Sequence, residues 1–204
     1  AGDALLRRGK RAGFAVNARP DRSPHGGADG LRDGSAALLR AALCTALMAA
    51  LSQIAVPMPT GVPVTLQTFA FALAGYCQRP RFALLSAAAY LLLGLAGAPV
   101  YAGFGAGVGT LAGPTGGFLA GFVPMCALFA LAAARPGRLR CVLLSLSAIA
   151  ACHALGTAWF CVVGHMGPGA AFLAVSAPYL IKDAASAAGA WLLCRALRRA
   201  RVIR

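Results

Sequence analysis

The chain alternates between apolar runs and short connections that are polar or rich in proline and glycine. Six apolar runs cover residues 36–56, 64–77, 82–98, 118–134, 141–163 and 170–194. Crossing the hydrocarbon core of a bilayer takes about 20 mainly apolar residues, with a range near 17 to 25. The second run is shorter, so we expect that helix to be tilted or supported by neighbouring protein. The pattern predicts an all-α integral membrane protein with six transmembrane helices.

Basic residues occupy alternate connections between these runs. They stand at Arg40, at Arg79 and Arg81, at Arg135, Arg138 and Arg140, and at several positions from Arg195 to Arg204, whereas the other three connections hold no Lys or Arg. Lys and Arg accumulate on the cytoplasmic side of membrane proteins. The pattern therefore predicts that both termini are cytoplasmic, which requires an even number of spans, and it predicts a multi-pass protein of the cytoplasmic membrane.

The amino-acid composition also indicates that lipid rather than water surrounds most of this protein. Hydrophobic residues make up 59% of the 204 residues, charged residues only 12%, and Glu is absent. The net charge of +14 raises the question of nucleic acid binding, but the basic residues gather at the ends and in two connections. A basic groove with interleaved aromatic residues is missing, so we expect no nucleic acid partner.

The ends of the chain differ from the apolar centre. Residues 1–35 are rich in Arg, Gly, Asp and Pro, and we interpret them as a disordered basic cytoplasmic tail. Residues 36–197 form the predicted transmembrane domain, which binds the substrate, and residues 198–204 a second basic tail. The sequence contains no GxxxxGK[ST] motif, so we expect no ATP hydrolysis by that route and no enzymatic activity. His153 stands alone in the fifth run, which favours a hydrogen-bonded interior histidine over a metal ligand.

Two uncharged connections are long enough to cover a binding site. The first contains three prolines in "PMPTGVP", and the second reads "PVYAGFGAGVGTLAGPTGG". We expect both to be ordered loops on the outer side, because irregular backbone near a bilayer must be covered by protein or line a cavity. Gln53 and Gln67 place neutral hydrogen-bonding groups near the first loop. Gly117 and Gly121 are expected on one helix face that allows close packing.

Two opposite charges, Lys182 and Asp183, interrupt the last apolar run in "APYLIKDAAS". A charge at the bilayer centre costs about 2.5 to 3.5 kcal/mol on insertion scales, so such residues usually have a function. Adjacent helical residues point about 100° apart, and we therefore expect the two side chains to flank a ligand rather than to face each other. The alternative is a structural ion pair that fixes the last helix against its neighbours.

Small residues recur at every fourth position of the first run, at Ala42, Ala46 and Ala50. This spacing produces a smooth stripe on one helix face, which permits close approach of another helix. The spacing alone does not distinguish packing within the six-helix bundle from docking of a separate subunit.

Three strings of the sequence resemble the BioY family, the biotin-binding S components of energy-coupling-factor (ECF) vitamin transporters. They are "PTGVPVTLQTFAFALAG", "YLLLGLAGAPVYAGFGAGVGTLAGPTGGFLAGF" and "PYLIKDAASAA", and the resemblance extends from about Ala41 to Leu193. It implies an S-component-like bundle with a substrate cavity open to the outside. It also implies biotin as the transported ligand, no cofactor, and separate coupling and ATPase subunits as partners. In that family an alanine stripe like the one above docks on the coupling subunit.

The resemblance also suggests roles for individual residues. Family members carry an Asp, and a Lys one turn later, on the sixth helix; here Asp183 takes the first position and Ser186 the second. Asp183 is expected to accept hydrogen bonds from the ureido N–H groups of biotin. Lys182, or hydroxyls and amides in its place, is expected to meet the biotin carboxylate. The further substrate-binding candidates are Gln67, Gln53, Tyr101, Phe104 and, in the GPTGG string, Thr115.

Two alternatives to biotin uptake stay open. Because Lys182 departs from the family pattern, the same fold can serve another small vitamin. The chain can also be a membrane interaction subunit that does not take part in transport.

Overall fold

The structure is a computed structural model that describes residues 25–134 and 137–201. The chain divides into two units, residues 1–35 and 36–204. Helix α1 runs from His25 to Ser52, so residues 25–35, which we expected in the disordered tail, are helical. The disorder predicted for residues 1–24 concerns a segment outside the described residues.

The second unit is built almost entirely from helices. After α1 come β1 (Ala55–Val56), β2 (Val64–Thr65), α2 (Gln67–Cys77), α3 (Pro80–Leu95), the short 3-10 helix η1 (Ala102–Phe104), α4 (Gly107–Ala112), α5 (Gly116–Ala134), α6 (Arg138–Gly164), α7 (Pro168–Val175) and α8 (Ala177–Arg199). The two strands pair antiparallel, with Ala55 opposite Thr65 and Val56 opposite Val64. Helices α1, α2, α3, α5, α6 and α8 correspond to the six apolar runs.

Length and hydropathy identify the helices that cross a membrane most clearly. Among the described residues, the apolar part of α1 and all of α5 and α6 are long and apolar enough to do so, and α3 is a shorter apolar helix. Helix α2 is short, as the second run predicted. Helix α8 has sufficient length but contains Lys182 and Asp183. The predicted fold class, an all-α membrane bundle, is confirmed.

The structure corrects two of the predicted elements. The run at 170–194 is not one helix but two, α7 and α8, because Ser176 leaves helical geometry between them. Pro178 then occupies the first turn of α8, where its missing amide hydrogen is not needed. The glycine-rich connection, which we expected to lack a helix, contains the short helices η1 and α4.

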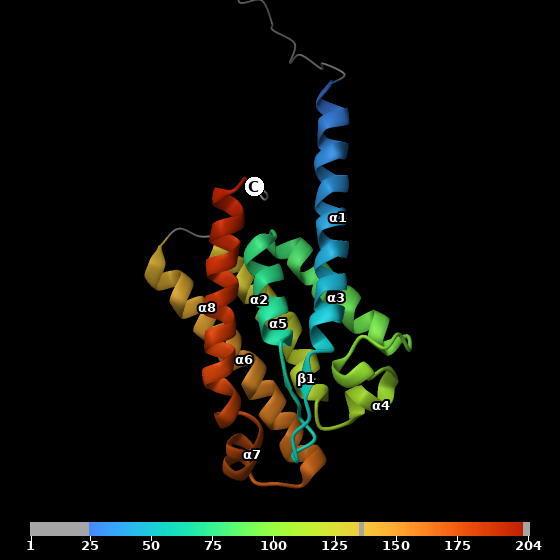
Figure 1. The fold of residues 1–204 in the computed structure, drawn as a ribbon, viewed down its shortest axis with the longest axis vertical. Helices are drawn as coiled ribbons and strands as arrows, with labels where there is room; N and C mark the ends of the chain where they lie inside the picture. The colour runs from blue at the N-terminus through green and yellow to red at the C-terminus, as the bar shows by residue number, and fades with distance from the viewer. Residues whose placement is uncertain (1–24, 135–136, 202–204) are drawn as a thin grey trace, which may run out of the picture. The chain divides into compact units, whose positions relative to one another are not determined.

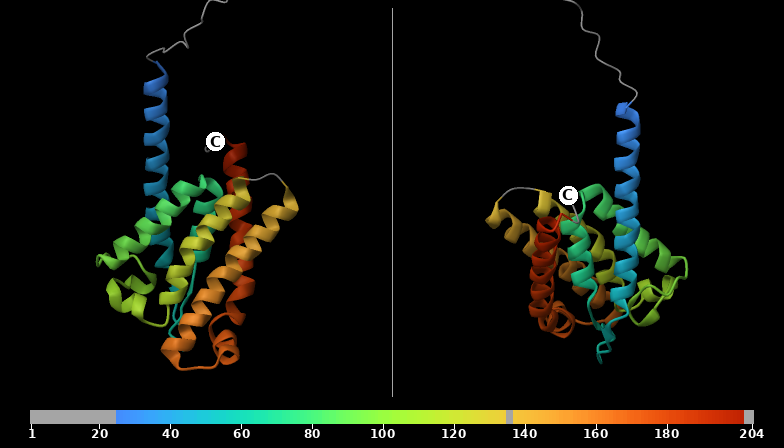
Figure 2. Two further views of the ribbon diagram at one scale, coloured as in Figure 1. Left: turned by 180° about the vertical axis from the view of Figure 1, so that it is seen from behind. Right: turned by 45° about the horizontal axis from the view of Figure 1, so that its top comes forward.

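The basic connections gather at one end of the bundle. The start of α3, the start of α6 and the end of α8 lie together at the top of Figure 1. The β1–β2 hairpin, α4 and α7 lie at the opposite end, which Figure 2 shows from two further directions. This arrangement follows the alternation of charged and uncharged connections in the sequence.

Helices α5 and α6 form the most extensive helix pair of the bundle. Gly117 and Gly121 on α5 face α6, as the glycine spacing predicted. A Cβ atom at Gly117 would lie 2.6 Å from the backbone oxygen of Leu155, and one at Gly121 would lie 3.0 Å from the Cα of Cys152. This close approach fixes the positions of the α5 and α6 side chains that line the cavity described below.

We expect Gly117→Ala to destabilise the protein, because the added methyl group collides with backbone that cannot move aside alone. Overpacking of this kind typically costs about 1 to 3 kcal/mol. Gly109→Ala is the matched control, since a Cβ at Gly109 meets no atom within 4 Å. Thermal unfolding in detergent, followed by the loss of monodisperse protein, measures both variants. Equal midpoints would contradict the close packing of α5 on α6.

Candidate functional site

A cavity of about 540 Å³ opens among α2, α5, α6 and α8, at the end of the bundle that holds the hairpin. Its size lies within the usual range of small-molecule sites. Its apolar lining includes Phe118, Leu119 and Phe122 from α5 and Ile149 from α6. Hydrogen-bonding groups from β2, α2, α6 and α8 line the same cavity. A ligand with a flat apolar part and a compact polar part fits such a lining.

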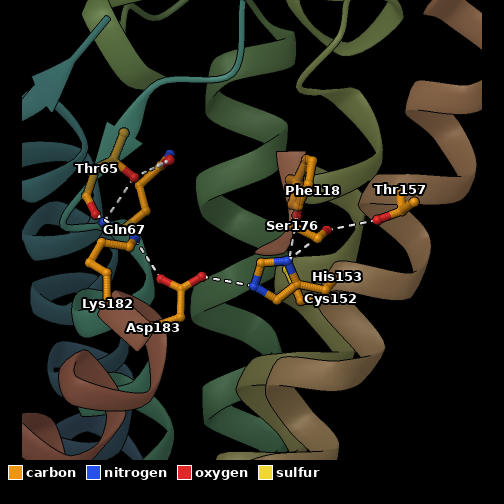
Figure 3. A network of polar contacts seen from close by, with 9 residues as sticks. All are labelled: Thr65, Gln67, Phe118, Cys152, His153, Thr157, Ser176, Lys182 and Asp183. Atoms are coloured by element: carbon orange, nitrogen blue, oxygen red, sulfur yellow. Dashed lines mark hydrogen bonds and ion pairs between the residues drawn. The ribbon is translucent and has the colours of Figure 1, made fainter. Parts of the chain in front are cut away.

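Asp183 is the centre of the polar groups that line the cavity. Its carboxylate lies between two basic groups, with Oδ2 3.0 Å from Nε2 of His153 and Oδ1 2.5 Å from Nζ of Lys182 (Figure 3). The Asp183 side chain is only 10% exposed. Within the described part of the chain, Oδ1 contacts the Lys182 ammonium group and has no further hydrogen-bond partner. A carboxylate oxygen can accept from more than one donor, so Oδ1 is well placed to accept a hydrogen bond from a ligand as well.

His153 holds the other carboxylate oxygen through a chain of hydrogen bonds. Its Nδ1 lies 3.0 Å from Oγ of Ser176, and Ser176 Oγ lies 2.7 Å from Oγ1 of Thr157 (Figure 3). A carboxylate can only accept, so Nε2 of His153 must carry the proton that it donates to Asp183. The break between α7 and α8 thus contributes to the site, because it positions the Ser176 side chain to bond His153.

Lys182 joins α8 to the hairpin. Its ammonium group donates to the backbone oxygen of Thr65 on β2 at 2.9 Å, in addition to its contact with Asp183. Our expectation that Lys182 and Asp183 do not face each other is therefore wrong. The lysine side chain is long and flexible enough to fold back over the neighbouring carboxylate. An ammonium group has three donors, which leaves one for a ligand in the cavity.

Gln67 lines the cavity, as predicted, but its polar atoms are already held. Its amide nitrogen donates to the hydroxyl of Tyr90 at 2.7 Å, and its amide oxygen accepts from Thr65 Oγ1 at 3.0 Å. The side chain is buried at the start of α2. This double attachment orients the amide, and the oxygen still has one lone pair free to accept a hydrogen bond from a ligand.

Both uncharged loops predicted as a cover contribute to the lining. The first provides Pro57, Met58 and Val62, and the second provides Tyr101 and Thr110. Each loop is tied to the bundle. The Tyr179 hydroxyl donates to Val62 O at 2.6 Å, and the Tyr101 hydroxyl donates to Leu91 O at 2.7 Å. The hydroxyl groups of both tyrosines therefore anchor the loops, and the Tyr101 ring packs against Tyr90.

Three predicted site residues are not brought into the cavity. Phe104 is 70% exposed and Ser186 is half-buried on α8, and neither belongs to the lining. Gln53 positions the second loop instead, since its amide nitrogen donates to Tyr101 O at 3.2 Å and its oxygen accepts from the Phe104 amide at 2.8 Å. Thr115, by contrast, lines the cavity as predicted.

Sequence reasoning missed the role of His153, which we interpreted only as an interior histidine with satisfied hydrogen bonds. It is buried and hydrogen-bonded, but it also lines the cavity and binds the carboxylate. The signal was available: His153 and Asp183 are single polar residues in separate apolar helices, and buried charges require partners. Among the described residues, no group of three His, Cys, Asp or Glu side chains is arranged to hold a metal ion.

The alanine stripe of α1 lies on an exposed face of the second unit. Ala42, Ala46 and Ala50 are all exposed, while Thr45 on the opposite side bonds Ser86 O of α3 at 3.1 Å. The stripe therefore does not serve packing within the bundle, which was one of the two alternatives. It is free to contact lipid or another protein.

Comparison with known proteins places the chain in a family. The model of the BioY family matches residues 24–202. This chain belongs to the BioY family. A probable biotin transporter BioY of Pyrococcus horikoshii is 34% identical over 157 residues, which is 77% of this chain and 93% of that protein. A biotin transporter BioY of Thermotoga maritima is 42% identical over 86 residues, 42% of this chain and 50% of that protein.

A solved structure has the same fold. The crystal structure of the S-component for biotin from an ECF-type ABC transporter superposes with a TM-score of 0.73 at 21% sequence identity, over 82% of this chain and 93% of that chain. Because of the low identity, we use this likeness for the fold only. The resemblance to BioY proteins that the three sequence strings indicated is thereby confirmed.

Proposed function

We propose that this BioY protein binds biotin from the outside of the cell and acts as the biotin-specific component of an ECF-type vitamin transporter. The observation that carries the proposal is the Lys182–Asp183 pair at the cavity, whose buried Oδ1 has no partner other than Lys182 among the described residues. Family membership supports the choice of biotin, because curated BioY relatives carry that function in their names.

Because Lys182 and Asp183 are in close contact, we infer that both bind the same end of biotin, the ureido group. The ureido group has N–H donors and a carbonyl acceptor side by side, and the pair offers an acceptor and a donor side by side. A ureido N–H donates to Asp183 Oδ1, and the ureido oxygen accepts the remaining hydrogen of the Lys182 ammonium group. The carboxylate stands at the opposite end of biotin, so Lys182 does not reach it at the same time.

In this orientation the rest of biotin lies along the apolar residues of the cavity. The fused rings lie against Phe118 and Phe122, which provide flat apolar surfaces. The valeryl chain extends toward the two loops, where Thr110 and Thr115 provide hydroxyl groups at the cavity. The carboxylate is then met by hydroxyls, backbone amides or water near the opening, which avoids burying its charge.

Transport requires partners, because the sequence contains no nucleotide-binding motif. We assign ATP hydrolysis to separate ATPase subunits and contact with a membrane-embedded coupling subunit to the exposed face of Ala42, Ala46 and Ala50. The exposure of the stripe supports this assignment, because small side chains allow two helices to approach closely within lipid. The protein resides in the cytoplasmic membrane with both termini inside.

Binding by the purified chain tests the proposal. Monodisperse protein is dialysed against a panel of water-soluble vitamins, and each bound vitamin is quantified. We expect saturable binding of biotin alone at one site per chain. Preferential binding of a different vitamin would reassign the substrate, and no binding of any vitamin would favour a membrane subunit without a transport role.

We expect Lys182→Ala to weaken binding of biotin and of biotin amide by the same factor, roughly tenfold or more for a lost charged hydrogen bond. Both ligands carry the ureido group, and only biotin carries the carboxylate. Isothermal titration of wild type and variant with both ligands measures the two factors. A loss confined to biotin would show that Lys182 binds the carboxylate and would reverse the proposed orientation.

Reporter fusions test the membrane orientation. Fusions at Arg138 should report a cytoplasmic position, whereas fusions at Gly107 and Gly167 should report an external one, since Lys and Arg mark the inner side. The two outer sites stand in different connections, so they check each other. An external signal at Arg138 would contradict the six-span topology.

A further inference from the structure

Two further hollows lie at the end of the bundle that carries the basic connections. Figure 1 shows this end opposite the β1–β2 hairpin. The first, which we name the basic cavity, measures about 220 Å³ and is lined by Arg138, Arg195, Arg198, Tyr76 and Trp191. The second, the α6–α8 groove, measures about 360 Å³. Tyr76, Arg138 and Trp191 line both, so the two hollows are continuous.

The arginines of the basic cavity come from two helices and are partly fixed. Arg198 donates to the backbone oxygen of Tyr76 at 2.7 Å, and the Arg195 guanidinium lies 4.8 Å from the centre of the Trp191 ring. Arg138 is the first residue of α6 and reaches the cavity from the other side. Three guanidinium groups therefore surround a small space whose other walls are aromatic or aliphatic.

The second unit has no carboxylate side chain to neutralise these arginines. Asp183 is the only acidic residue between positions 36 and 204, and it pairs with Lys182 and His153. It also stands twelve positions before Arg195 on α8, roughly 18 Å away at 1.5 Å per residue. All three arginines are exposed, so an anion from outside this part of the chain can reach them, and a guanidinium cluster is well suited to phosphate.

The α6–α8 groove extends from the basic cavity along the apolar part of the bundle. Its walls are Val142 and Leu146 on α6 and the small residues Ala184 and Ala188 on α8. These four side chains are exposed, and α6 and α8 contact each other far less than α5 and α6 do. In a membrane protein an apolar groove that is open at its side faces the lipid chains.

We propose that the basic cavity and the α6–α8 groove together bind one anionic phospholipid, with its phosphate between Arg138 and Arg195 and one acyl chain in the groove. Arg198, held by Tyr76, adds a third positive charge. Basic pockets between transmembrane helices near the membrane surface commonly hold such headgroups. A lipid so placed packs against α6 and α8 next to the basic connections, and Ile149, which lines the groove, also lines the proposed biotin site.

Native mass spectrometry of the full chain with added lipids tests this proposal. We expect one dioleoyl phosphatidylglycerol molecule to be retained far more strongly than dioleoyl phosphatidylcholine. In the Arg138→Gln/Arg195→Gln variant this preference should fall by about fivefold for each arginine lost. The matched control is Arg79→Gln/Arg81→Gln, which removes two positive charges at the same end but outside the basic cavity. An equal fall in both variants would reduce the effect to general surface charge and overturn the site.

A second pair of variants tests the groove without any change of charge. Ala188→Leu fills the groove and should weaken lipid retention, whereas Ala185→Leu, an exposed position of the same helix outside the groove, should leave it unchanged. Glycerol phosphate, which has the headgroup chemistry but no acyl chain, should not displace the lipid. Displacement by glycerol phosphate at similar concentration, or retention unaffected by Ala188→Leu, would reject the phospholipid as the occupant.

Discussion

Asp183→Asn should weaken biotin binding roughly tenfold to a hundredfold. The asparagine side chain has one acceptor oxygen where the carboxylate has two, and a charged hydrogen bond is worth about 1.5 to 3 kcal/mol. In the native protein, one oxygen is occupied by His153 and the other is left for the ligand and Lys182. An amide that keeps its oxygen for the ureido N–H must turn its nitrogen toward His153 Nε2, which forces the imidazole proton onto Nδ1 and removes the negative charge from the site.

Binding and stability must be measured separately for this variant. Removing the Asp183 charge also leaves Lys182 without its partner, so the variant should be less stable as well as weaker in binding. Titration calorimetry on the monodisperse fraction isolates the effect on affinity. Ser186→Ala, one turn away on α8 and outside the cavity lining, is the matched control and should bind biotin normally. Normal affinity in Asp183→Asn would remove the ion pair from the binding site.

Ala46→Trp should abolish biotin uptake in cells while leaving biotin binding by the isolated protein unchanged. Ala46 is in the middle of the exposed stripe, and an indole ring there prevents another helix from approaching closely. The residue is far along the sequence from the polar network and does not line the cavity. Uptake of labelled biotin by cells that also produce the coupling and ATPase subunits, together with binding by purified protein, separates the two effects.

The same substitution at Ala185 is the control for Ala46→Trp. Ala185 is exposed on α8 and lies outside the cavities, so a tryptophan there meets lipid and should reduce uptake little. If Ala46→Trp supports normal uptake, the alanine stripe does not contact the coupling subunit. If it reduces binding as well, the stripe acts through the fold of the bundle.

Hydropathy and charge predicted the bundle well because both follow directly from the membrane. The six apolar runs, the short second helix and the gathering of basic connections at one end all follow from what lipid and the membrane surface tolerate. The break at Ser176 was not predicted, since a single polar residue in an apolar run does not show whether a helix bends. Its purpose, a hydrogen bond to His153, depends on a residue more than twenty positions away.

Only part of the candidate site could be predicted from the sequence. Asp183, Gln67, Tyr101 and Thr115 line the cavity as expected, since polar groups and family strings mark them in the sequence. Gln53 stands at the edge of the first uncharged loop and Phe104 in the second, but which side of a loop faces the cavity is set by tertiary contacts. The fold-back of Lys182 onto Asp183 likewise depends on a flexible side chain and on Thr65 O, which helix geometry alone does not reveal.

A crystal or cryo-electron microscopy structure of this chain with biotin tests the central claim most directly. We predict one biotin in the cavity, with a ureido nitrogen within hydrogen-bonding distance of Asp183 Oδ1, the ureido oxygen next to Lys182 Nζ, and the carboxylate near the two loops. Biotin bound with its carboxylate on Lys182, or bound outside this cavity, would contradict the account.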